Sequence, residues 1–178
     1  MKISTKTMVS VGMFAAVLSV LSVLTIPMPS GVPLTLQTFA MALCGYALGA
    51  KRGTAAVALY LLLGAVGMPV FAGMTGGVSR FVGPTGGFLW GFLFLAAFCG
   101  FAKEQKSPEV RILLSLLGLA ICHLLGVVQY SVVAATTPAT AFFTVSLPYL
   151  IKDILSAAGA YAVALPLHRA LREERAAA

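Results

Sequence analysis

Six mainly apolar stretches, each close to the length that crosses a lipid bilayer, lie between charges, prolines and glycine clusters. The second and fourth are somewhat short, so that tilt or flanking segments would have to complete them. With 60% hydrophobic and 10% charged residues and a mean hydropathy of +0.99, the chain is far more apolar than a soluble domain. We therefore predict an all-α integral membrane protein, a single domain of six transmembrane helices over residues 7–26, 33–50, 54–72, 85–102, 110–136 and 142–167.

The positions of the basic residues predict an orientation. With six spans, the loops on one side of the membrane contain a single cation, Arg80, and Lys152 lies inside the last stretch. Cytoplasmic loops are enriched in Lys and Arg, so both termini are predicted to be cytoplasmic. Because the basic residues are explained by this orientation, the net charge of +7 implies no nucleic-acid partner. The remaining cations, which share the cytoplasmic side, are Lys2, Lys6, Lys51, Arg52, Lys103, Lys106, Arg111, Arg169, Arg172 and Arg175.

The first apolar stretch is predicted to be a retained helix and not a cleaved secretory signal. It is about twenty residues long, as a spanning helix requires. It ends in TIPMPSGVP, which lacks the small-residue pattern of a cleavage site.

Motifs for nucleotide, metal or nucleophilic chemistry are not found in the sequence. There is no GxxxxGK[ST] phosphate-binding loop, so another chain would have to supply energy for uphill transport. The cysteines Cys44, Cys99 and Cys122 fall inside apolar stretches and are predicted to be core residues. His123 is predicted to be a hydrogen-bonded helix residue and His168 an interfacial one. We expect no cofactor, no metal and no enzymatic activity.

Two charges stand side by side in the last apolar stretch, Lys152 and Asp153. Each would cost about 2.5–3.5 kcal/mol at the centre of a membrane helix, so exposure to lipid is excluded. Helix neighbours point about 100° apart, which predicts separate partners within one interior wedge. Pro148 suits the first turn of this helix and places the pair one to two turns below its outer end. The alternative is that Lys152 snorkels outward and Asp153 makes a structural hydrogen bond.

A second informative stretch, GMPVFAGMTGGVSRFVGPTGGFLWGF at 67–92, is rich in glycine and contains Arg80. Glycine allows the backbone to approach a ligand closely and leaves N–H groups available as donors. Irregular backbone near a membrane is tolerated only against protein or a water-filled cavity. The stretch is therefore predicted to line a binding site, the alternative being a flexible external loop whose arginine contacts lipid headgroups.

The order of four motifs resembles the BioY family of biotin transporters, the substrate-binding S components of energy-coupling factor transporters. These motifs are VPLTLQTFA at 32–40, GMPVFAGMTGG at 67–77, GPTGGF at 83–88 and PYLIKD at 148–153. The resemblance implies a six-helix bundle in a bacterial or archaeal cytoplasmic membrane that binds biotin from outside. The positions that match the family's site are Asp153, Thr75, Gly76, Gly77, Gln37 and Phe88.

The chain departs from the family at two positions that supply cations for a carboxylate, since it has Ser156 and Leu89 there. Lys152 and Arg80 are the available substitutes. Biotin requires an apolar slot, an acceptor for its ureido N–H groups and a cation for its carboxylate. Asp153 suits the acceptor. Two other readings remain open, a solitary facilitator of a small vitamin and a membrane enzyme using His123 and Asp153.

Small residues on the first stretch predict a helix-packing face. Gly12 and Ala16 are four residues apart, as are Ala15 and Ser19, and such spacing allows another helix to approach closely. The family resemblance implies that this face meets a transmembrane coupling protein, which works with two cytoplasmic ATPases. The alternative is packing within the chain's own bundle.

Overall fold

The computed structural model describes residues 4–28 and 32–177, with side chains up to residue 167. This part of the chain is mostly helical. Its longer helices are α1 (Thr5–Val23), α2 (Gln37–Leu48), α3 (Ala50–Ala65), α5 (Gly86–Glu104), α6 (Pro108–Val133) and α8 (Leu147–Ala177). Its short elements are an antiparallel hairpin of β1 (Thr25–Ile26) and β2 (Leu34–Thr35), and the helices α4 (Ser79–Val82) and α7 (Pro138–Val145).

Each predicted apolar stretch overlaps one of the longer helices, but their lengths differ from the prediction. Among the described residues, four helices are long and apolar enough to cross a membrane, namely Thr5–Val23, Gly86–Glu104, Pro108–Val133 and Leu147–Leu167. The helix α2 has 12 residues and α3 has 16. The fourth stretch, predicted to be short, forms the 19-residue α5, and the sixth is divided between α7 and α8.

Side-chain caps and prolines determine where the helices after α5 begin. Ser107 accepts a hydrogen bond from the amide of Val110 and precedes Pro108, which suits the first turn because its missing N–H would have no helical partner. Thr137 caps α7 in the same way. Pro148 is the second residue of α8, which confirms the predicted position of this proline in the first turn.

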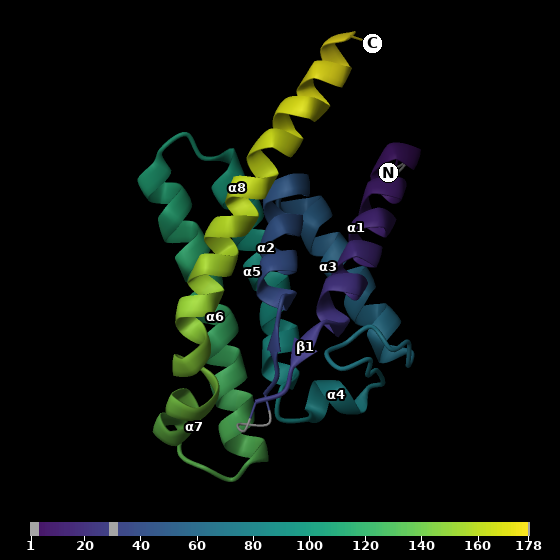
Figure 1. Ribbon diagram of the computed structural model, residues 1–178. Coiled ribbons are helices and arrows are strands. Elements are labelled where there is room, and N and C mark those ends of the chain that lie inside the picture. The colour runs from purple at the N-terminus through teal and green to yellow at the C-terminus, as the bar shows by residue number, and fades with distance from the viewer. Residues whose placement is uncertain (1–3, 29–31, 178) are drawn as a thin grey trace.

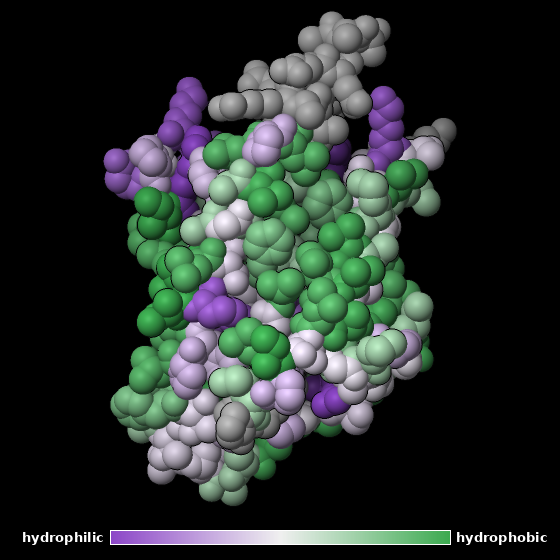
Figure 2. Space-filling view, in the orientation of Figure 1, coloured by the Kyte–Doolittle hydropathy of each residue, from purple (hydrophilic) through white to green (hydrophobic). Residues whose placement is uncertain are grey.

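The two ends of the molecule differ in what they carry. In Figure 1 the marks for both chain ends lie at one end, together with the α2–α3 and α5–α6 connections. The hairpin, α4 and α7 lie at the opposite end, here called the hairpin end. Lys103 donates to the carbonyl of Ala47 at 2.9 Å and so joins α5 to the last turn of α2. Figure 2 shows apolar side chains over the middle of the molecule and strongly hydrophilic ones mainly at the end that carries the termini.

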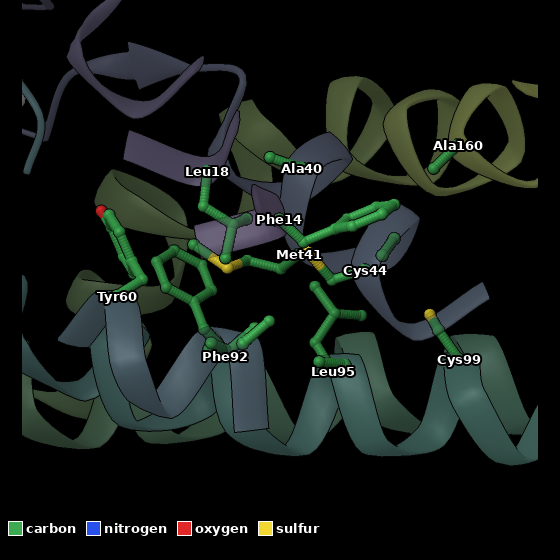
Figure 3. Packing of buried hydrophobic residues seen from close by; sticks show 14 of the residues in the cluster. Phe14, Leu18, Ala40, Met41, Cys44, Tyr60, Phe92, Leu95, Cys99 and Ala160 are labelled. Atoms are coloured by element: carbon green, nitrogen blue, oxygen red, sulfur yellow. The ribbon is translucent and has the colours of Figure 1, made fainter. Parts of the chain in front are cut away.

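The core lies where α1, α2, α3, α5 and α8 meet. Leu18 and Met41 point toward each other there, the ring of Phe92 lies between Met41 and Tyr60, and Cys99 lies farther along α5 (Figure 3). All three cysteines are buried thiols, as predicted.

Glycines bring α5 against α6. A Cβ added at Gly87 would lie 2.0 Å from the carbonyl oxygen of Leu125, and one at Gly91 would lie 2.6 Å from the Cα of Cys122. No side chain fits in either place, so the second half of the glycine-rich stretch packs helix on helix.

Candidate functional site

A cavity of about 460 Å³ opens among the hairpin, the loop between α3 and α4, the first turns of α2, α5 and α8, and the middle of α6. Its volume is in the range of small-molecule sites. Most of its wall is apolar, with aromatic rings from Phe71, Phe88 and Phe92. The charged or ionisable side chains that line it include Arg80, His123, Tyr149, Lys152 and Asp153.

Asp153 is buried, and both of its carboxylate oxygens face a basic side chain. Nε2 of His123 lies 3.2 Å from Oδ2, and the ammonium of Lys152 contacts Oδ1. The hydroxyl of Thr38, which also lines the cavity, faces the same carboxylate. The predicted separate partners are present, His123 for Asp153 and the carbonyl of Thr35 for Lys152, but the two charges also contact each other, which was not predicted. The flexible four-carbon stem of lysine lets its ammonium fold back to the adjacent residue, although the two Cβ atoms point about 100° apart.

Lys152 also connects α8 to the hairpin. Its ammonium donates to the carbonyl oxygen of Thr35 at 3.2 Å, and one turn earlier the hydroxyl of Tyr149 donates to the carbonyl oxygen of Val32. The Lys152 side chain is 23% exposed, and its charge is turned into the protein. The alternative in which Lys152 snorkels outward is therefore wrong.

His123 joins α6 to the start of α8. Its Nδ1 lies 2.8 Å from the hydroxyl of Ser146, and its ring meets that of Phe88 edge to face at a centroid distance of 5.9 Å. The prediction of a hydrogen-bonded helix residue is confirmed. From the sequence, His123 and Asp153 come together only in the reading of a membrane enzyme, and no direct contact between them is predicted, because the carboxylate comes from another helix.

Ser146, His123 and Asp153 have the side-chain types of a hydrolase triad, but not its access. Ser146 is fully buried, and it lines a separate, almost wholly apolar pocket of about 330 Å³ instead of the cavity that contains Asp153. A nucleophile must reach its substrate, so this chain of contacts holds side chains in place. Among the described residues, no group of three or more His, Cys, Asp or Glu residues could hold a metal ion.

Gln37 lines the cavity at the start of α2 and belongs to a buried hydrogen-bond chain. Its amide nitrogen donates to the hydroxyl of Tyr60 at 3.0 Å, and its amide oxygen accepts from the hydroxyl of Thr35 at 3.2 Å. The side chain is thus fixed from both ends before any ligand arrives.

The loop between α3 and α4 supplies only part of its predicted contacts. Thr75 lines the cavity and donates to the carbonyl of Ala72 at 2.9 Å. Gly76 and Gly77 are not among the lining residues. A Cβ at Gly76 would lie 2.3 Å from the carbonyl of Met68, and Gly77 has φ +99°, a left-handed conformation that favours glycine. These two glycines shape the loop that presents Thr75.

Arg80 lies at the rim of the cavity and is exposed to solvent. Within the described side chains, no carboxylate lies within ion-pair distance of Arg80. The lining charges are Arg80, Lys152 and Asp153, which sum to +1 when His123 is neutral. The cavity is therefore suited to a small anion. Phe88 and Leu89 form apolar wall. Leu89 stands at a position where the BioY family resemblance would place a cation for a carboxylate.

The small residues of α1 divide between two faces. Ala15 is 1% exposed and belongs to the core, so for this residue the alternative of packing within the bundle holds. Ala16 is exposed, and a Cβ added at Gly12 would meet no atom within 4 Å. Ser19 is half-buried and donates to the carbonyl of Ala15. Gly12 and Ala16, flanked by the exposed Met13, therefore form an open apolar surface, here called the α1 outer face.

The fold and the cavity define a membrane-embedded protein with a binding site for a small molecule. A model of the BioY family matches residues 1–173. The chain is 46% identical to the biotin transporter BioY of Thermotoga maritima over 121 residues, which cover 67% of this chain and 71% of that one. It is 38% identical to the probable biotin transporter BioY of Pyrococcus horikoshii over 133 residues, covering 75% and 78% of the two chains.

A solved structure agrees with these sequence matches. The crystal structure of the S-component for biotin from an ECF-type ABC transporter superposes with a TM-score of 0.83 at 26% identity, over 94% of this chain and 95% of that chain. The chain belongs to the BioY family, whose matched relatives are named as transporters and not as enzymes.

Proposed function

We propose that this chain is the biotin-binding S component of an energy-coupling factor transporter. The observation that carries the proposal is the cavity at the hairpin end, where apolar walls surround a buried carboxylate and an uncompensated cation. Membership of the BioY family and the likeness to an S-component for biotin support the same ligand.

The chemistry of biotin matches the groups around the cavity. Its bicyclic ring and valeryl chain are apolar and require an apolar slot, for which Phe71, Phe88 and Phe92 provide wall. Its ureido group carries N–H donors, and Asp153 is the acceptor, because a carboxylate has up to four lone-pair sites. Thr75 and Gln37 add polar contacts at the edge of the slot.

Arg80 is the better candidate for the cation that holds the biotin carboxylate. The charge of Lys152 is already balanced by Asp153, and its ammonium also donates to the hairpin. The charge of Arg80 has no such partner within the described side chains, and a guanidinium can bind a carboxylate through two parallel hydrogen bonds. A monoanionic ligand beside Arg80 would bring the sum of charges in the cavity to zero.

The proposed topology has six membrane spans, with both termini in the cytoplasm of a bacterium or archaeon and the cavity facing outward. The end that carries the α2–α3 and α5–α6 connections also carries Lys51, Arg52 and Lys103, as the positive-inside rule requires of a cytoplasmic face. In this topology the short helices α2 and α3 cross together with the extended segments that flank them.

The proposed partners are a transmembrane coupling protein and two cytoplasmic ATPases. The α1 outer face is the proposed contact for the coupling protein, because Gly12 and Ala16 let a second helix approach closely. The sequence has no phosphate-binding loop, so ATP would be hydrolysed by the partners.

The ligand is tested by binding and by mass spectrometry of the small molecule that copurifies with the protein. Biotin should bind with one-to-one stoichiometry in calorimetry, and riboflavin and thiamine should not compete with it. The proposal fails if biotin gives no heat and does not displace labelled biotin.

Energy coupling is tested separately, in vesicles. Concentrative uptake should require ATP and the coupling subunits, whereas binding should require neither. Uphill accumulation of biotin by this chain alone would favour a solitary facilitator.

A further inference from the structure

His123 lines the cavity but lies in none of the four BioY motifs, and it contacts Asp153, which ends the last of them. His123 Nε2 lies 3.2 Å from Oδ2 of Asp153, and both side chains are about nine-tenths buried. An ionised carboxylate only accepts hydrogen bonds, so Nε2 carries the hydrogen in this contact. The other ring nitrogen, Nδ1, faces the fully buried hydroxyl of Ser146 at 2.8 Å.

These contacts fix the imidazole on three sides. Ser146 holds Nδ1, Asp153 faces Nε2, and the ring of Phe88 stands at 87° to the imidazole. His123 therefore presents its N–H to Oδ2 in one orientation before any ligand binds.

Asp153 needs such a partner because its carboxylate rotates easily. The terminal torsion of aspartate is broad, and Lys152, on a flexible stem, contacts only Oδ1. A donor on Oδ2 from α6 opposes rotation toward Lys152. His123, Lys152 and the hydroxyl of Thr38 then face three of the roughly four lone-pair sites of the carboxylate, which leaves a site for an N–H group of the ligand.

We infer that His123 is a positioning residue, which holds the carboxylate of Asp153 in the orientation that accepts the ureido N–H of the ligand. The inference rests on the proposed function, because it assigns the ureido group of biotin to Asp153. It goes beyond that function by assigning affinity and selectivity for cyclic ureas to a residue of α6.

Two substitutions separate the two ends of the imidazole. The amide nitrogen of glutamine reaches about as far as Nε2, so His123→Gln keeps a donor for Asp153. The amide of asparagine reaches only about as far as Nδ1, so His123→Asn keeps the contact with Ser146 and loses that with Asp153. His123→Phe, which fills the same space without donors, provides a second test if the asparagine variant does not fold.

Biotin affinity should follow the contact with Asp153. We expect His123→Asn and His123→Phe to weaken biotin by about tenfold, as for the loss of a hydrogen bond to a charged group, and His123→Gln to stay within about threefold of the parent protein. A biotin analogue methylated on both ureido nitrogens cannot donate to Asp153. This analogue should therefore bind more weakly than biotin, and its affinity should be the same for the parent protein and for all three variants.

A double-mutant cycle separates positioning from direct contact. In an Asp153→Asn background, His123→Asn should change biotin affinity by less than about twofold, because the carboxylate that it positions is absent. An undiminished effect in that background would mean that His123 contacts the ligand itself and would overturn the inference.

Three further results would overturn the assignment of His123 as a positioning residue. Folded asparagine and phenylalanine variants that bind biotin as tightly as the parent protein would overturn the inference. So would a loss of thermal stability without ligand that glutamine does not restore, because this would indicate a purely structural role. If the parent protein itself does not bind biotin, the proposed function fails, and this inference fails with it.

Discussion

Lys152 and Asp153, neighbours in the sequence, form an ion pair at the wall of the cavity, although successive residues on a helix point in different directions. The aspartate is buried, and the lysine is partly exposed toward the cavity. The ammonium of Lys152 thus balances a negative charge that is buried in an apolar surrounding.

Replacing Asp153 with asparagine should weaken the binding of biotin and of its methyl ester to the same extent. A charge-assisted hydrogen bond is worth about 1.5–3 kcal/mol, which corresponds to roughly 10- to 150-fold in affinity. The ester retains the ureido group, so the loss should not depend on the carboxylate of the ligand. Calorimetry with both compounds measures this, and an unchanged affinity would show that Asp153 is structural.

Arg80→Gln should weaken the binding of biotin but not of its methyl ester, because the ester has lost the charge that Arg80 would hold. Arg52→Gln is the matched control, since Arg52 is also exposed but lies near the end that carries the termini. If the Arg80 variant binds biotin as tightly as the parent protein does, Arg80 is excluded as the partner of the biotin carboxylate.

Lys152→Met should act on stability and on both ligands. Breaking a buried ion pair by removing one partner costs about 3–5 kcal/mol, and here less, because Lys152 is partly exposed. We expect a lower Tm without ligand and weaker binding of acid and ester alike. A variant that loses only acid binding would instead identify Lys152 as the carboxylate partner.

Leucine on α1 should separate the α1 outer face from the core. Gly12→Leu and Ala16→Leu should reduce copurification with the coupling protein and leave biotin binding nearly unchanged, because added atoms at Gly12 meet no neighbour. Ala15→Leu should lower the Tm instead, since Ala15 is buried in the bundle. If Gly12→Leu abolishes biotin binding as well, the face does not serve a partner.

Adding a single methyl group at Gly87 should destabilise the bundle. The Cβ of Gly87→Ala would lie 2.0 Å from the backbone of α6, so α5 and α6 would have to separate. We expect a clear fall of the Tm in detergent. Gly12→Ala, whose Cβ meets nothing within 4 Å, is the control and should not lower the Tm, because alanine favours a helix more than glycine does.

Apolar patterning predicted the helical segments well, because length and hydropathy alone decide which stretches can lie in a membrane. It failed where backbone geometry matters. Gly49, with φ +82°, separates α2 from α3, and the extended residues before Gln37 pair with those after Leu24 instead of continuing the helix. Pairing between segments distant in the sequence leaves little trace in local composition.

The site was predicted through its charges and less well through its neighbours. Lys152, Asp153 and Arg80 stood out because charges are expensive in an apolar chain. His123 and Tyr149 were not assigned to the binding site, since nothing in their own segments shows that they contact Asp153 or the hairpin. Gly76 and Gly77 were assigned to the site by their match to the family's motif, but in the structure they shape the loop, as the conformational freedom of glycine also allows.

The shortness of α2 has a consequence for how deep the ligand lies. Twelve residues of helix are about 18 Å long, whereas the hydrocarbon layer is about 30 Å thick. Compared with a helix that spans the layer, α2 is therefore roughly two turns too short. The hairpin and the cavity occupy the place of the missing turns, at the end of α2 where Gln37 begins (Figure 1). The cavity thus lies where a longer helix would continue, and a ligand bound there would fill the space that the missing turns leave between the neighbouring helices.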